Sequence, residues 1–158
     1  AGYRLDTGTV PGRIDRTQVS PYAVPMHVEL FALCDYAQES AGKLTALGIF
    51  DAISVREFPA IHPILCLCAR IRFPVYELGQ RSIHVEISDN QGQHLVPPLD
   101  GRVSIDGIGG DSACANVTLT LFNIKMEREC SWRVSLSVDG QERAAIPLYI
   151  RKHTSARA

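Results

Sequence analysis

The sequence lacks any apolar run near the roughly 18 residues that a membrane-spanning helix needs. It also lacks a sustained 3.6-residue periodicity and contains no G-x-S-x-G, H-E-x-x-H or C-x-x-C motif. Residues 1–21 hold no apolar segment of the kind found in secretory signals. These absences predict a protein with no transmembrane span, no helical bundle and no familiar catalytic motif.

Charge of one sign is not in large excess either. The 158 residues carry a formal net charge of −1, with 46% hydrophobic and 21% charged residues, as is usual for one globular domain. No global field is therefore expected to attract nucleic acid or an anionic membrane. Residues 1–25 and 151–158 are net positive and the stretch between them is net negative. Such basic ends either bind a neighbouring copy or remain solvated.

Cysteines are few and odd in number. The five thiols show none of the spacing that a small disulfide scaffold requires. Reduced cysteines of this kind are typical of the cytosol, so we expect a cytoplasmic location.

Alternation of apolar and polar residues is what the sequence has in quantity. In residues 81–89 and 130–139 apolar and polar side chains alternate strictly, which is typical of half-buried antiparallel strands. Similar segments recur along the chain at residues 26–34, 43–51, 53–58, 64–73, 102–106, 115–124 and 144–151. The turn residues Asp139 and Gly140 between two such segments indicate a hairpin.

About eight or nine short strands with turn signals between them predict an all-β fold. We expect a single antiparallel β-sandwich, Ig-like or C2-like, over residues 26–150, with a closed barrel as the second possibility. Residues 1–25 would form an extended N-terminal arm and residues 151–158 a basic tail. The segment 34–43 could hold one helical turn at most.

His62, Cys66 and Cys68 stand at a spacing that resembles a metal site. On an extended strand, however, Cys66 and Cys68 point the same way, and a flat strand cannot wrap a tetrahedral ion. We therefore predict no metal and interpret both cysteines as small apolar side chains beneath a second layer. His62, between Pro59 and Pro63, is expected to cap a loop.

Other polar residues give weaker signals. Asp89, Asn90, Asp106 and Asp111 could gather at one end of a sandwich and hold Ca²⁺, or could simply form turns. The histidines are scattered, and no serine or cysteine nucleophile is tied to one by spacing. We accordingly predict no catalytic residue and no cofactor, although a small hydrolase assembled from distant His and Asp residues stays a third hypothesis.

Three segments together resemble a known family: VELFALCDYAQESAGKLTALGIFD (28–51), FPAIHP (58–63) and VDGQERAAIPLYI (138–150). The sequence is similar to small bacterial proteins without an assigned function. The resemblance implies an all-β domain, a bacterial or phage context, no known activity and a chain that begins near Met26.

The N-terminal arm lies outside this resemblance, and its composition cannot build a core. Its scattered apolar residues could lie along the sheet edge or groove of a neighbour. They are Tyr3, Leu5, Val10, Ile14, Val19 and Tyr22. The leading hypothesis is therefore a non-enzymatic protein-interaction or assembly module, with protein partners, either copies of itself or a larger assembly. The alternative is a sandwich whose loops bind Ca²⁺ or a small ligand.

Overall fold

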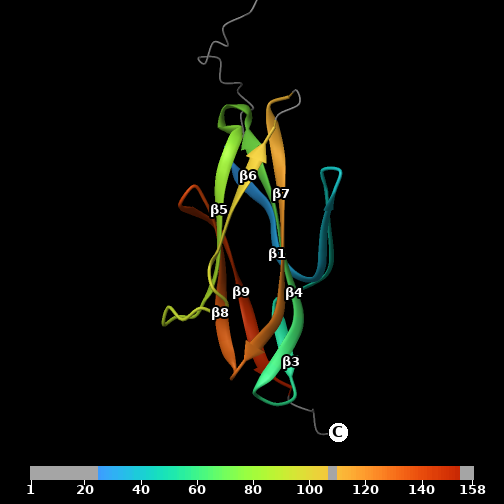
Figure 1. Cartoon of the computed structure of the whole chain (residues 1–158), viewed down its shortest axis with the longest axis vertical. Coiled ribbons are helices and arrows are strands. Elements are labelled where there is room, and N and C mark those ends of the chain that lie inside the picture. The colour runs from blue at the N-terminus through green and yellow to red at the C-terminus, as the bar shows by residue number, and fades with distance from the viewer. Residues whose placement is uncertain (1–24, 107–109, 154–158) are drawn as a thin grey trace, which may run out of the picture.

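Two β-sheets packed face to face make up the described part of the chain, residues 25–106 and 110–153 of a computed structural model (Figure 1). The four-stranded sheet has the order β2 (Lys43–Phe50), β1 (His27–Ser40), β4 (Ala60–Pro74) and β7 (Ser112–Met126). The five-stranded sheet has the order β3 (Ala52–Val55), β9 (Gln141–Lys152), β8 (Cys130–Val138), β5 (Gly79–Ser88) and β6 (Leu99–Ile105). A single 3-10 turn, η1 (Val75–Glu77), connects β4 to β5. The predicted all-β sandwich is confirmed.

Neighbouring strands are antiparallel within the described residues except β3 and β9, which run parallel. None of the described residues belongs to a helix that is long and apolar enough to cross a membrane.

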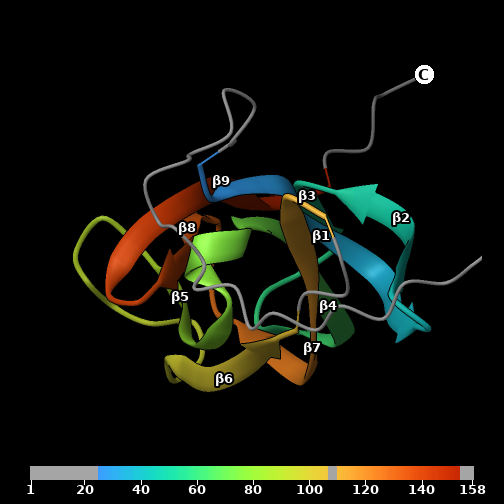
Figure 2. The same ribbon diagram turned by 90° about the horizontal axis from the view of Figure 1, so that it is seen from above.

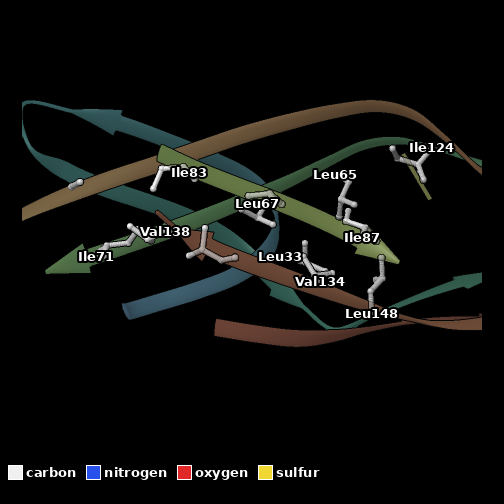
Figure 3. Close-up of a cluster of buried hydrophobic side chains, with 14 of the residues drawn as sticks. Leu33, Leu65, Leu67, Ile71, Ile83, Ile87, Ile124, Val134, Val138 and Leu148 are labelled. Carbon is white, nitrogen blue, oxygen red and sulfur yellow. The ribbon is translucent and has the colours of Figure 1, made fainter. Parts of the chain in front are cut away.

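The core lies between the inward faces of the two sheets. β4 buries Leu65, Leu67 and Ile71 on its inner side, as the alternation of its sequence predicts. β8 contributes Val134 and Leu136, both fully buried. Figure 3 shows the labelled side chains of β4 and Val134 of β8 between the ribbons, with Ile87 of β5 and Leu148 of β9. Truncating one such residue to alanine would cost about 2–5 kcal/mol, so this layer holds the sandwich together.

Two tight turns use the left-handed backbone that hairpins require. Asp139 and Gly140 have φ of 50° and 76° and join β8 to β9, which confirms the predicted hairpin. Ala41 and Gly42, with φ of 50° and 76°, join β1 to β2 in the same way. The segment 34–43 is therefore a hairpin and holds no helical turn. The prediction missed the hairpin because the Ala-Gly pair was not recognised as a turn signal.

Seen from above, the sandwich has two sides at which edges of the sheets meet (Figure 2). β1 lies beside β9 on one side, and β6 lies beside β7 on the other.

Candidate functional site

The β1–β2 hairpin folds over the outer face of its own sheet. β1 pairs with β4 only as far as Cys34 opposite Cys66, whereas its pairing with β2 continues to Ser40 opposite Lys43. The bend falls at Gly48, whose φ is +65°. A Cβ at this position would overlap the Asp35 side chain, with its Cγ 2.9 Å away, so glycine is required there. In Figure 1 the hairpin leaves the sheet and turns back alongside it.

A second, small apolar cluster lies under this hairpin. Cys34, Cys66 and Cys68 are buried in it, and Ala37 and Leu44 of the hairpin pack against them. The cysteines are free thiols, and the predicted second layer over Cys66 and Cys68 is confirmed. Sequence reasoning did not identify the hairpin as this layer, since periodicity carries no information on where a hairpin bends.

Burial makes Cys34 and Cys68 poor nucleophiles. Burial, with a smaller contribution from the neighbouring Cys68, raises the pKa of the Cys34 thiol to about 12. Burial likewise raises the pKa of Cys68. A thiol in this state is not a nucleophile at neutral pH. Among residues 25–106 and 110–153, no three His, Cys, Asp or Glu side chains converge as a metal ligand set would.

His62 differs from its prediction. It lies in β4 opposite Ile124, a core residue, and its ring meets Phe50 edge-on with centroids 6.1 Å apart. Its Nε2 is buried and has no hydrogen-bond partner in the described part of the chain. The expected loop cap is therefore wrong, because β4 begins at Ala60 and already includes the residue.

The acidic loop residues do not gather. Asp89 follows β5 at one end, whereas Asp106 follows β6 at the other, since Gly79 pairs with Ile105. The Asp89 carboxylate accepts hydrogen bonds from the Gln91 and Gln93 amides at 2.8 and 2.9 Å, so it forms a turn. A hollow of about 540 Å³ lies between β6 and β7, but neither Asp89 nor Asp106 lines it.

His27 and His94 each face one carboxylate, whereas His84 lies between two. His84 Nδ1 lies 2.8 Å from Asp100 Oδ1, and its Nε2 lies 3.8 Å from Glu86 Oε2. The group occupies the solvent-facing side of the five-stranded sheet, where the Asp100 side chain is 82% exposed. Because both ring nitrogens face carboxylates rather than a hydroxyl or thiol, His84 is not arranged to activate a nucleophile.

The outer face of the four-stranded sheet carries large apolar side chains in solvent. Ile64 and Phe122 lie opposite each other in the β4–β7 ladder and are 45% and 65% exposed. Ile61, 61% exposed, precedes them on β4, and Ile49, 60% exposed, lies opposite Cys34 on β2. We call Ile49, Ile61, Ile64 and Phe122 the outer apolar face. It lies beyond the bend, on the part of the sheet that the hairpin leaves uncovered.

This face depends on an irregularity that no periodicity reveals. His62 and Ile124 point into the core, and so does Leu65. In a regular strand residues 62 and 65 would face opposite sides, because side chains alternate. The change of side occurs at Pro63 and at Asn123, whose φ is 55°. As a result Ile61 and Ile64 both point outward. The residues predicted for the N-terminal arm, from Tyr3 to Tyr22, lie outside the described residues.

The comparisons place the chain in a family. Residues 29–151 match a family of unknown function (DUF6941), and the chain belongs to that family. This confirms the resemblance to a family without an assigned function. No curated protein matches the sequence.

Two solved proteins are distantly similar in fold. One is the Pseudomonas fluorescens alkylpurine DNA glycosylase AlkC bound to DNA containing an abasic site analog, at 9% identity and a TM-score of 0.47. Another is the β-glucosidase of Listeria innocua in complex with isofagomine or with glucose, at 12% identity and a TM-score of 0.43. The likeness covers 80% and 77% of this chain but only 30% and 16% of those proteins. Likenesses this weak assign no activity to the chain.

Proposed function

We propose that this chain is a non-enzymatic protein-interaction module that assembles with further copies of itself, and that its N-terminal arm engages the neighbouring copy. The outer apolar face is the observation that carries the proposal. Large apolar side chains gathered in solvent are unusual for a monomer and are typical of contact surfaces. Ile64 and Phe122 lie directly opposite each other on the adjacent strands β4 and β7, and Ile61 precedes them on β4.

Magnitudes indicate that this face benefits from a second contact. Fully burying a large apolar side chain contributes about 1.5–3 kcal/mol, and these four are already about half buried. Their burial would therefore contribute roughly 3–6 kcal/mol from each copy, or about 6–12 kcal/mol from two copies. Association costs about 4–15 kcal/mol in lost translational and rotational freedom, which is of the same size. A second contact would make the complex stable, and the N-terminal arm is the segment proposed to supply it.

Sedimentation velocity over a concentration series tests the proposal. The full chain should sediment as an oligomer, and Phe122→Ser should weaken association by about tenfold or more. Tyr76→Ser is the matched control, because Tyr76 is an equally exposed aromatic residue (61%) that lies on η1, away from the outer apolar face. A chain that begins at Met26 should also dissociate at higher concentrations than the full chain. Monomers at every concentration for the full chain would refute the proposal.

A further inference from the structure

Half of β1 is an open sheet edge. β4 pairs with β1 from His27 onward, but β2 joins its other side only from Leu33. Residues 27–32 therefore have no strand on that side among the residues described. Six residues of strand present about 20 Å of unpaired backbone, enough to bind one additional strand.

Half of β9 is open in the same way and faces the open edge of β1. β3 joins β9 only from Tyr149, so residues 141–148 have no neighbour on that side within the described ranges. The Tyr149 amide donates to the Asp51 carbonyl on the β3 side at 2.8 Å. Backbone groups alternate along a strand, so the amide and carbonyl of Ala145 point to this open side as well. Pro147 points its carbonyl the same way but has no amide, so β1 is the better edge for pairing.

A groove runs between these two edges. Residues 26–31 and 142–144 line a hollow of about 480 Å³. Phe31 also lines the adjoining hollow of about 390 Å³, together with Ile146 and Pro147. Val28, Phe31, Ala144 and Ile146 pack against the core and form the apolar floor. Figure 2 shows β1 beside β9 on this side of the sandwich. The groove offers apolar contacts below and unpaired backbone along its wall, which is the chemistry of β-strand addition.

The groove begins where the N-terminal arm joins the domain. Residues 13–20 are the longest stretch of the arm without proline or glycine, and they include the β-branched Ile14, Thr17 and Val19. Eight residues are enough to cover the six-residue edge of β1. The arm therefore contains one segment with the length and composition of an edge-pairing strand.

A second copy is the better source of this segment than the same chain. To pair with its own β1, the arm would have to reverse direction within residues 21–26, which contain no Gly, Asn or Asp. These residues include Pro21 and Pro25, and a residue before proline favours extended backbone, so such a reversal is disfavoured. A reciprocal exchange between two copies gives each one an arm.

We propose that residues 13–20 of a second copy form an additional strand in the groove between β1 and β9, hydrogen-bonded to residues 27–32 of β1. This rests on the proposed assembly function and specifies how the arm engages its neighbour. The contact is symmetric, so it closes at two copies and leaves the outer apolar faces free to meet each other or a further pair.

Photocrosslinking of the full chain tests the exchange. Benzoylphenylalanine replaces Thr17, and equal amounts of unlabelled and ¹⁵N-labelled chain are mixed, equilibrated and irradiated. Mass spectrometry should find residue 17 joined to peptides of β1 or β9, with about half of the linked pairs containing one light and one heavy chain. Benzoylphenylalanine in place of Leu5 is the control and should give at least fivefold less product at these strands. Links only within one chain, or none, would overturn the exchange.

A pair of neighbouring alanines provides the second test. Ala144 lines the groove, whereas Ala145 is exposed and points its side chain to the opposite face of β9. Ala144→Arg should lower the crosslink yield at least tenfold, and Ala145→Arg should leave it unchanged. Circular dichroism of both variants shows whether either one misfolds. If one does, the crosslink positions found with benzoylphenylalanine at residue 17 alone still test the proposal. Intermolecular links outside the groove would refute this site but leave the assembly function standing; a monomeric chain would refute both.

Discussion

The bend of the β1–β2 hairpin yields a quantitative prediction. Gly48→Ala should destabilise the protein more than Gly42→Ala, although both glycines have left-handed backbone, with φ of +65° and +76°. An alanine in this region costs about 1–2 kcal/mol at either site. At Gly42 a Cβ meets nothing within 4 Å, so this is the whole cost. At Gly48 the Cβ would also force the exposed Asp35 side chain out of its position, which adds about 0.5–1.5 kcal/mol.

Thermal unfolding of the two single variants and of the double variant measures the difference. In a chain of this size each kcal/mol lowers Tm by about 2–4 °C, so Gly48→Ala should melt a few degrees below Gly42→Ala. Adding Asp35→Ala to Gly48→Ala should bring the cost to within about 0.5 kcal/mol of that of Gly42→Ala, because the displaced carboxylate is gone. Equal losses for the two single variants, or no recovery in the double variant, would refute the assignment of the bend to this contact.

Three further predictions concern the outer side of the four-stranded sheet and the hairpin that covers part of it. At pH 8 a maleimide should modify the half-exposed Cys130 rapidly but reach Cys34 only in denaturant, because burial raises the Cys34 pKa to about 12; peptide mapping decides this, and fast labelling of Cys34 would count against the covered cluster. Glu29→Gln should cost on the order of 1 kcal/mol at pH 7, because the carboxylate accepts hydrogen bonds from Arg72 and Arg70, which lower its pKa below 4.5. That contribution is complete above the unfolded pKa and is lost as pH falls through the lowered one, so denaturation curves of Glu29→Gln and the native chain should converge in acid rather than stay parallel. Asn116→Ala should cost about 1 kcal/mol and speed amide exchange at the hairpin tip, because Asn116 Nδ2 donates to the Gly42 carbonyl at 3.0 Å; unchanged exchange would contradict this anchor.

Period-two alternation predicted most of the sandwich, because inward and outward residues differ along each strand. β4 and β8 are the clearest cases, with Leu65 and Val134 buried as the pattern requires. The position of the β1–β2 hairpin was not predictable in this way. It depends on one left-handed glycine, Gly48, and on its contact with Asp35, and neither leaves a mark in the hydrophobic pattern.

The candidate interaction surfaces were also partly beyond the sequence pattern. Ile64 and Phe122 face outward by the same alternation that buries Leu65, but Ile61 faces outward only because the strands change side at Pro63 and Asn123. The groove between β1 and β9 exists because β2 and β3 pair with only part of these two strands. The periodicity of a single strand does not show how far its neighbour extends along it. The N-terminal arm, by contrast, could be singled out from composition alone, and that prediction lies outside the described residues.

The outer face of the four-stranded sheet makes a final argument for assembly. The hairpin covers one part of this face, where Ala37 and Leu44 pack onto Cys66 and Cys68. Glu29 forms ion pairs with Arg70 and Arg72 on the same face. Another part carries Ile64 and Phe122, which are 45% and 65% exposed. We propose that a second protein chain covers these two side chains, because large exposed apolar residues are typical of contact surfaces. If Phe122→Ser raised solubility without changing sedimentation, the large side chains would have another role and this argument would fail.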